Sequence, residues 1–188
     1  MSVAYEDHAG PWTVDDVLAL PDDPRNRIEL VGGALMMSPS PGVPHQRASR
    51  RLAGLLERAA EAAGAPVEIL EAVNVVTGDG LLIPDIVVAD AAAAADAGLT
   101  LDPGDVLAVV EIASPSTRIT DRKLKPALYA AAGIPVFWRV ELEPAPRLYA
   151  GELHGGTYTE TIVHAGTTAR VERPFPVEIA PGALLSRP

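Results

Sequence analysis

Three segments rich in β-branched and aliphatic residues constrain the fold more than any other feature of the sequence. They span residues 66–77, 83–90 and 105–114, and they are separated by Gly/Asp turns or by the alanine-rich segment 91–104. Apolar runs of this length between turn residues are typical of β-strands. We therefore expect three neighbouring strands of one sheet in the middle of the chain.

Helix patterns stand on both sides of these strands. Apolar residues recur at helical spacing within residues 44–63, which predicts a long amphipathic helix. Residues 120–133 indicate a second long helix, with Thr120 or Asp121 as its N-cap. A shorter helix is predicted over residues 12–23 at the beginning of the chain.

Glycines divide the remaining sequence into strands and turns. Two β-like runs within residues 27–42 flank the pair Gly32-Gly33, which predicts a hairpin. Gly64 is placed to end the first long helix. Residues 134–142 read as a further strand, and the C-terminal part alternates between apolar and polar residues and turns on glycines, which is typical of antiparallel strands.

These elements predict a mixed α/β (α+β) fold, with a central mixed β-sheet flanked by helices and additional antiparallel strands at the C-terminus. No internal repeat or low-complexity linker divides the chain, so a single domain is expected over residues 1–188. A chain of this length can bury a sizeable core without disulfides or a structural metal.

The composition excludes several classes of protein. The chain has no cysteine, which excludes thiolate catalysis and Cys-ligated zinc. It has 15 Lys+Arg against 25 Asp+Glu, a formal net charge of -10, so any nucleic-acid site must be a local patch. No run approaches the roughly 18 apolar residues of a membrane span, and the N-terminus lacks the apolar core of a signal peptide. We expect a cytoplasmic protein with no membrane partner.

Two carboxylates interrupt the central strands. Asp85 precedes residues 86–90, and Glu111 lies near the end of residues 106–112. If these two strands pair antiparallel, the start of the first lies opposite the end of the second, and the carboxylates meet. Such an all-oxygen site suits Mg²⁺ or Mn²⁺. Equally, Asp85 could cap a turn and Glu111 could lie at a solvated sheet edge.

A lysine on the second long helix is a third candidate for this site. Lys125 follows Asp121 by four residues, and a short turn leads from the Glu111 strand to this helix. Here a lysine could orient a water or stabilise charge that develops on a phosphate. It could also form an ordinary ion pair with Asp121. Pro126 follows directly, and a proline inside a helix costs about 3 kcal/mol, which would displace Lys125 from the carboxylates.

Long stretches of the sequence resemble a known family. RIELVGGALMMSPSPGVPHQRASRRL, IPDIVVAD and VVEIASPSTRITDRKLKPALYAAAGIPVFWRVEL look, in this order and across about residues 27–142, like the Uma2 family of restriction-endonuclease-like proteins. The string EIASPST…D…K…LYAAAGIP is the most specific portion. That family is assigned to the PD-(D/E)XK nuclease superfamily. The resemblance implies a central mixed sheet flanked by helices and Mg²⁺-dependent phosphodiester cleavage.

The resemblance implies roles for three of the residues already singled out. Asp85 matches the aspartate of the PD motif, and Glu111 matches the (D/E) position. The superfamily's lysine ordinarily stands two residues later, where this chain has Ala113. In Uma2-like sequences the lysine is relocated to the next helix, which corresponds here to Lys125.

The resemblance also implies a metal and two further site residues. Asp85, Glu111 and the backbone carbonyl of Ile112 would bind Mg²⁺ or Mn²⁺, while Lys125 positions the attacking water. Glu29 matches an acidic residue before the Gly-Gly hairpin, and His45 matches a histidine that opens the first long helix. Both are expected to face the metal. On residue type alone, Glu29 could be an exposed strand residue and His45 a structural one.

These readings leave more than one function open. The leading hypothesis is a metal-dependent endonuclease that hydrolyses phosphodiester bonds in nucleic acid, with DNA as the expected substrate. The alternative is a catalytically silent nuclease-fold protein that binds nucleic acid or a protein partner, because a fold does not impose a function. A hydrolase of another phosphate ester would use the same metal site.

Basic residues gather in two short segments beside the expected site. Arg47 and Arg51 share roughly one face of the first long helix, and Arg118 and Arg122 lie around the start of the second. As a set they are expected to hold a phosphate backbone, although a solvated helix face would look the same. A homodimer is a further expectation, by analogy with nucleases in general.

Overall fold

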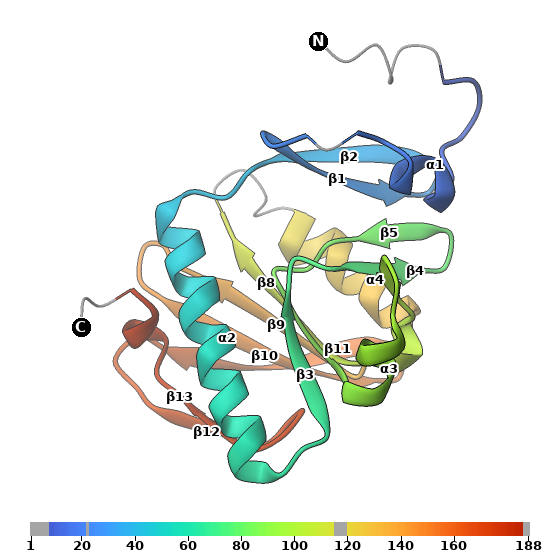
Figure 1. Cartoon of the computed structure of the whole chain (residues 1–188). Helices are drawn as coiled ribbons and strands as arrows, with labels where there is room; N and C mark the ends of the chain where they lie inside the picture. The colour runs from blue at the N-terminus through green and yellow to red at the C-terminus, as the bar shows by residue number, and fades with distance from the viewer. Residues whose placement is uncertain (1–7, 22, 115–119, 186–188) are drawn as a thin grey trace.

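The computed structural model describes residues 8–21, 23–114 and 120–185 as a mixed α/β fold (Figure 1). The strands are β1 (Asn26–Val31), β2 (Ala34–Pro39), β3 (Val67–Glu71), β4 (Asn74–Thr77), β5 (Gly80–Leu82), β6 (Ile86–Asp90), β7 (Thr100–Leu101), β8 (Val106–Ala113), β9 (Val136–Glu141), β10 (Arg147–His154), β11 (Thr157–His164), β12 (Ala169–Val171) and β13 (Val177–Ile179). The helices are α1 (Val14–Leu18), α2 (Val43–Ala63), α3 (Ala91–Asp96) and α4 (Lys125–Ala131), with a π-helical turn at Thr120–Leu124 and 3₁₀ turns at Pro103–Asp105 and Pro181–Leu184.

The main sheet has six strands in the order β11-β10-β9-β8-β6-β3. Its neighbours pair antiparallel except β8 and β9, which are parallel. Within it, β6 and β8 pair antiparallel with Ile86 opposite Val110. The predicted register is therefore confirmed, and it brings Asp85 and Glu111 to the same end of the strand pair.

A second, five-stranded sheet has the order β2-β1-β5-β4-β7. The prediction of one strand over residues 66–77 is wrong, because the chain breaks at Ala72, whose φ of 54° lies in the left-handed region. Before the break β3 belongs to the main sheet, and after it β4 belongs to the second sheet. Neither glycine nor proline marks this break in the sequence, although left-handed backbone is uncommon for alanine.

Helix α2 covers one face of the main sheet (Figure 1). Its buried residues Leu52 and Leu56 belong to one cluster with Val110, Ile112 and Trp138 of the sheet. Full burial of each such side chain contributes about 1.5–3 kcal/mol. The strands β12 and β13 and the last 3₁₀ turn complete this layer, since their apolar residues join the same cluster.

The opposite face of the main sheet is covered by α4 and by the second sheet. Tyr129 of α4 and Val75 of β4 lie in one buried cluster with Val87, Val109 and Phe137. Because both faces are covered, consecutive residues of β6 and β8 are apolar instead of alternating with polar ones. This explains why β6 and β8 stand out in the sequence, and why the carboxylates beside them are buried.

The turn and cap residues behave as their chemistry predicts. Gly32 and Gly33 both have positive φ, 56° and 75°, as a tight two-residue hairpin requires. Gly64 ends α2 with φ 61°, a left-handed C-cap. Thr13 caps α1, and its hydroxyl accepts a hydrogen bond from the Asp16 backbone N–H. The predicted hairpin and the predicted helices within residues 12–23 and 44–63 are confirmed, and the helix predicted over 120–133 is a π-helical turn followed by α4.

The C-terminal strands are antiparallel, as expected from the alternating pattern. Strand β10 pairs antiparallel with both β9 and β11, and β12 pairs antiparallel with β13. In the described part of the chain, every helix is too short or too polar to cross a membrane.

Candidate active site

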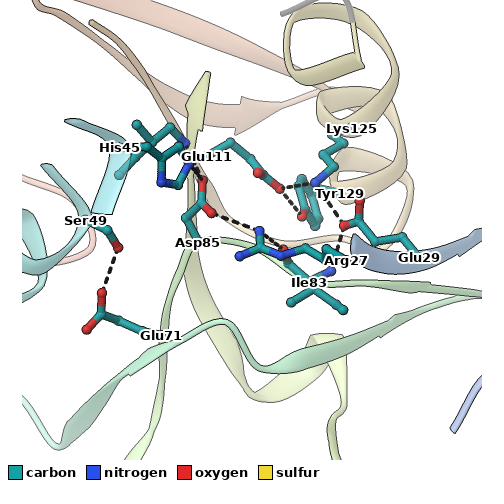
Figure 2. A network of polar contacts seen from close by, with 11 residues as sticks. Arg27, Glu29, His45, Ser49, Glu71, Ile83, Asp85, Glu111, Lys125 and Tyr129 are labelled. Atoms are coloured by element: carbon teal, nitrogen blue, oxygen red, sulfur yellow. Dashed lines mark hydrogen bonds and ion pairs between the residues drawn. The ribbon is translucent and has the colours of Figure 1, made fainter. Parts of the chain in front are cut away.

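Segments distant in the sequence meet at one small cavity of about 40 Å³. They are the start of β6, the end of β8, the first turn of α2, the π-helical turn with the start of α4, and β1 (Figures 1 and 2). Such a volume holds a few waters or a hydrated ion. Its charged lining residues are Arg27, His45, Asp85, Glu111, Asp121 and Lys125.

Asp85 lies at the centre of this cavity and is 4% exposed. Its Oδ2 accepts hydrogen bonds from the backbone N–H of Ile112 at 2.7 Å and from Nε2 of His45 at 3.0 Å. Its Oδ1 accepts one from Nη1 of Arg27 at 2.9 Å. Burial alone would raise the pKa of Asp85, but the His45 hydrogen bond and the charges of His45 and Arg27 hold it below the ordinary value. Asp85 is therefore ionised and more than a turn cap.

Glu111 is buried from the other side of the same cavity. Its Oε1 accepts hydrogen bonds from Nζ of Lys125 at 2.9 Å and from the Tyr129 hydroxyl at 2.7 Å. Burial raises the pKa of Glu111 to about 8; Lys125 opposes this shift and the neighbouring Asp85 adds to it. Glu111 is 2% exposed, so the solvated-edge alternative is wrong.

Lys125 bridges two carboxylates in the protein interior (Figure 2). Its Nζ lies 2.9 Å from Oε1 of Glu111 and 2.9 Å from Oε1 of Glu29. Burial favours the neutral amine, but the two glutamates outweigh it and raise the pKa of Lys125, so the ammonium stays charged. The lysine points toward the proposed site, and it is not an exposed partner of Asp121 alone.

The π-helical turn explains how Lys125 is accommodated beside a proline. Residues Thr120–Leu124 form this wider turn, and α4 begins only at Lys125. Pro126 therefore stands at the start of the α-helix, where its missing N–H has no intrahelical partner to lose. π-helical turns are rare and occur frequently at functional sites. The displacement of Lys125 that Pro126 suggested does not occur.

His45 lines the cavity, whereas Glu29 does not line it and contacts Lys125 instead. Glu29 is 1% exposed, and its Oε1 accepts a hydrogen bond from the Ile83 backbone N–H at 2.8 Å. It is therefore not an exposed strand residue. His45 lies in the first turn of α2, where its Nε2 contacts Asp85. The Nδ1 atom of His45 is buried and has no hydrogen-bond partner among the described residues.

Three site residues were not identified from the sequence. Arg27 lies two residues before Glu29 on β1 and so shares its face of the strand. Tyr129 follows Lys125 by four residues on α4, which places both on one helix face. Asp121 was interpreted as a helix cap, but it is buried and lines the cavity. The two-residue spacing from Glu29 could have identified Arg27 as a site residue. The four-residue spacing from Lys125 could likewise have identified Tyr129.

The residues around the cavity fit a small, hard cation. Asp85 and Glu111 supply carboxylate oxygens, and the Ile112 N–H already faces Asp85. Because the N–H and C=O of one strand residue point to the same side, the Ile112 carbonyl faces this edge as well. Among the described residues no group of three or more His, Asp or Glu side chains forms a metal cluster. The donors that this cavity offers a cation are two carboxylates and a carbonyl. Mg²⁺ prefers such oxygen donors, with waters completing its coordination shell.

The arginines expected to bind nucleic acid differ in their surroundings. Arg47 is exposed on α2 and lines a hollow of about 520 Å³. This hollow adjoins the cavity, since Pro41 lines both. Arg51 donates a hydrogen bond to the carbonyl of Leu184 at 3.1 Å. Arg122 forms a two-point ion pair with Glu141. Arg118 lies outside the described residues.

Comparisons with known proteins concern the fold and the family of the chain. A crystal structure described as a putative nuclease belonging to DUF820, from Anabaena variabilis, aligns with a TM-score of 0.65, covering 86% of this chain and 89% of that chain at 16% identity. At this identity the likeness concerns the fold. No curated protein matches the sequence. The model of the family Uma2, described as "Putative restriction endonuclease", matches residues 14–185. With nearly its whole length matched, the chain belongs to the Uma2 family.

Proposed function

We propose that this protein is a Mg²⁺- or Mn²⁺-dependent endonuclease that hydrolyses phosphodiester bonds in nucleic acid, with DNA as the substrate. The observation that carries the proposal is the meeting of Asp85, Glu111 and Lys125 at one cavity, from three elements far apart in the sequence. The chain belongs to the Uma2 family, which is described as "Putative restriction endonuclease", and this supports the same class of reaction.

The charges around the cavity support a cation there. Among the described residues that pair with one another there, three acids (Glu29, Asp85 and Glu111) face two permanent cations (Arg27 and Lys125). The acids therefore outnumber the permanent cations, and burial amid these negative charges raises the pKa of Glu111. A buried carboxylate that is not fully compensated takes up a proton or a metal ion. A divalent cation would supply the missing positive charge.

Each residue has a role that its position allows. A bound cation would polarise the scissile phosphate and lower the pKa of a nearby water. Asp85, Glu111 and the Ile112 carbonyl would hold that cation. Lys125 stays charged, so it orients the attacking water and stabilises negative charge on the phosphate instead of removing a proton. His45 fixes the orientation of Asp85 through Oδ2.

The nucleic acid would approach over the first turns of α2. Arg47 and Arg50 are exposed there and line the hollow next to the cavity. Exposed arginines bind phosphate oxygens without reading sequence. Arg51 and Arg122 have partners within the protein, so we assign them a smaller share of this contact.

A second function is favoured by a specific observation. Both oxygens of Asp85 are already engaged, Oδ1 by Arg27 and Oδ2 by His45 and Ile112. A network saturated in this way is also what a catalytically silent protein would have, one that keeps the nuclease fold and binds nucleic acid or a protein partner without cleavage.

Cleavage assays separate the two functions. Purified protein is incubated with supercoiled plasmid, linear duplex DNA, single-stranded DNA and RNA, each with Mg²⁺, Mn²⁺ or chelator. The endonuclease proposal expects supercoiled DNA to be nicked only with metal. Binding without cleavage in every metal condition would establish the silent alternative. Light scattering on the same preparation tests the proposed homodimer.

Variants connect any activity to the site. Asp85→Asn and Lys125→Met should each lower the cleavage rate by at least a hundredfold, because they remove a metal ligand charge and the catalytic ammonium. Glu68→Gln is the matched control, since Glu68 is exposed on β3 away from the cavity. Wild-type cleavage by Asp85→Asn would mean that the nuclease in the preparation is a contaminant.

A further inference from the structure

Arg27 occupies an unusual position for an arginine beside a proposed metal ligand. Its side chain extends from β1 of the second sheet to the start of β6 in the main sheet (Figure 2). Nη1 donates to Oδ1 of Asp85 at 2.9 Å and to the carbonyl of Ile83 at 3.0 Å. The side chain is 19% exposed, so this ion pair is only partly screened by water.

The contact places a fixed positive charge where the cation would need a carboxylate oxygen. Asp85 can offer Oδ1 to a metal only if Arg27 moves or shares it, because Oδ2 is held by His45 and Ile112. Arginine does not deprotonate at any ordinary pH, so the competition cannot be relieved by losing a proton. Arg27 and a divalent cation therefore compete for Oδ1 of Asp85.

The structure also provides a place for the guanidinium when it is displaced. Arg27 lines the small cavity of about 40 Å³ and, in addition, a hollow of about 600 Å³ between α1, β1 and β5. Asp23 also lines this hollow. A long side chain at the boundary of two hollows can leave one for the other by rotating about its own bonds, without a change in the fold.

We propose that Arg27 is an internal competitor of the divalent cation at Asp85, and that it sets the affinity of the site for Mg²⁺ and Mn²⁺. This inference rests on the proposed function for the existence of the metal site. In the absence of metal, Arg27 compensates the charge of Asp85. When a cation binds, Arg27 releases Oδ1 and turns toward the larger hollow.

Isothermal titration calorimetry with Mn²⁺ on the full chain tests this role without measuring activity. Arg27→Gln removes the charge but keeps a polar side chain with an N–H donor. It should bind Mn²⁺ on the order of tenfold more tightly than wild type, because a positive charge next to the metal is lost. Arg27→Lys keeps the charge and should stay within about threefold of wild type.

Arg25→Met is the matched control for net charge. Arg25 lies two residues earlier and is 82% exposed, so its loss changes the charge of the protein equally but should leave Mn²⁺ affinity unchanged. Thermal melting in chelator verifies that each variant is folded. If Arg27→Gln unfolds, the Mn²⁺ affinities of Arg27→Lys and Arg27→His are compared instead at pH 8. At this pH histidine is largely neutral, so the second variant lacks the charge.

The outcomes separate this inference from the proposed function. Tighter Mn²⁺ binding by Arg27→Gln than by wild type supports the competitor role of Arg27. The same holds if Arg27→Gln binds Mn²⁺ and wild type does not. Equal or weaker binding by Arg27→Gln, with a wild-type protein that binds Mn²⁺, overturns the competitor role and leaves the metal site in place. Absence of Mn²⁺ binding in wild type and in every variant overturns both.

Discussion

Two clusters of charged side chains, each around a buried glutamate, lie side by side on the same face of the main sheet, and they differ in their balance. The first surrounds Asp85, Glu111 and Lys125. The second consists of Arg122 from the π-helical turn, Arg139 and Glu141 on β9, and Glu160 on β11. Strands β8 and β9 pair in register, with Glu111 opposite Arg139 and Ala113 opposite Glu141. One strand spacing separates a candidate active site from a structural ion-pair network.

The second cluster is balanced in charge. Glu141 accepts hydrogen bonds from Arg122 at 2.7 and 2.6 Å and also pairs with Arg139. Arg139 further contacts Glu160 and stacks over the ring of Tyr149. Burial would raise the pKa of Glu141, but the hydrogen bond from Arg122 and the charge of Arg139 hold it below its ordinary value.

The candidate site and the ion-pair network differ in how the charge of a buried glutamate is compensated. Glu111 and Glu141 are each 2% exposed. Their pKa values nevertheless shift in opposite directions, upward for Glu111 and downward for Glu141. Burial raises both pKa values and is the largest cause at Glu111, whereas at Glu141 the two neighbouring arginines outweigh it. The mark of the candidate site is a buried carboxylate for which burial and acidic neighbours outweigh the lysine that contacts it.

The largest expected difference between the clusters is in stability. Glu141→Gln leaves Arg139 buried without its main partner, and arginine cannot neutralise itself, so unfolding should become easier by about 3 kcal/mol. Glu111→Gln keeps an oxygen that accepts hydrogen bonds at a position where burial already raises the pKa of the carboxyl, and should change stability by less than about 1 kcal/mol. Urea unfolding in chelator measures both. Equal losses of stability in the two variants would show that the two clusters do not differ in this way.

The second prediction concerns the dependence of metal-free stability on pH. The folded-state pKa of Glu111 is raised to about 8, so the folded protein binds the extra proton and stability falls as pH rises from about 4.5 to about 8. The slope is at most about 1.4 kcal/mol per pH unit. The folded-state pKa of Glu141 is lowered, so its contribution is present above about pH 4.5 and is lost as pH falls further.

Denaturation midpoints between pH 3 and pH 9 provide the measurement. Glu111→Gln should remove the decline on the alkaline side and leave the acid side unchanged, and Glu141→Gln should do the reverse. A wild-type protein whose stability is flat between pH 5 and pH 8 would show that Glu111 is compensated by charges around it.

The smallest effect is expected at the rim of the second cluster. Glu160 is 33% exposed and lies 3.4 Å from Nη2 of Arg139, a loose and partly solvated contact. Glu160→Gln should therefore cost less than about 1 kcal/mol. The same urea unfolding assay measures it beside Glu141→Gln. A loss as large as that of Glu141→Gln would mean that Glu160, and not Glu141, carries the compensation of Arg139.

The strands, helices and the central pair of carboxylates were largely predictable from the sequence. The apolar runs located β6, β8 and β9, and helical spacing with Gly64 located α2. Antiparallel pairing of β6 and β8 was enough to bring Asp85 and Glu111 together. These inferences use periodicity and turn chemistry, which act over a few residues and are visible in a single sequence.

The division of the strands into separate sheets was not predictable in the same way. Residues 66–77 read as one strand, because the break at Ala72 carries no glycine or proline. Packing of β4 against β5 and of β3 against β6 decides where the run divides. Likewise Arg51 and Arg122 read as exposed cations, but carbonyls near the C-terminus and Glu141 engage them in the folded chain.

The local elements and the identity of the two central carboxylates follow from the amino-acid sequence. Their electrostatic surroundings arise only in the folded chain, where Arg27 meets Asp85 and Lys125 bridges Glu29 and Glu111. There too, two arginines pair with Glu141. Local structure follows from backbone geometry and hydrophobic spacing along the chain. The pKa of a buried carboxylate follows from the charges and the water excluded around it, and these come from segments that only folding brings together.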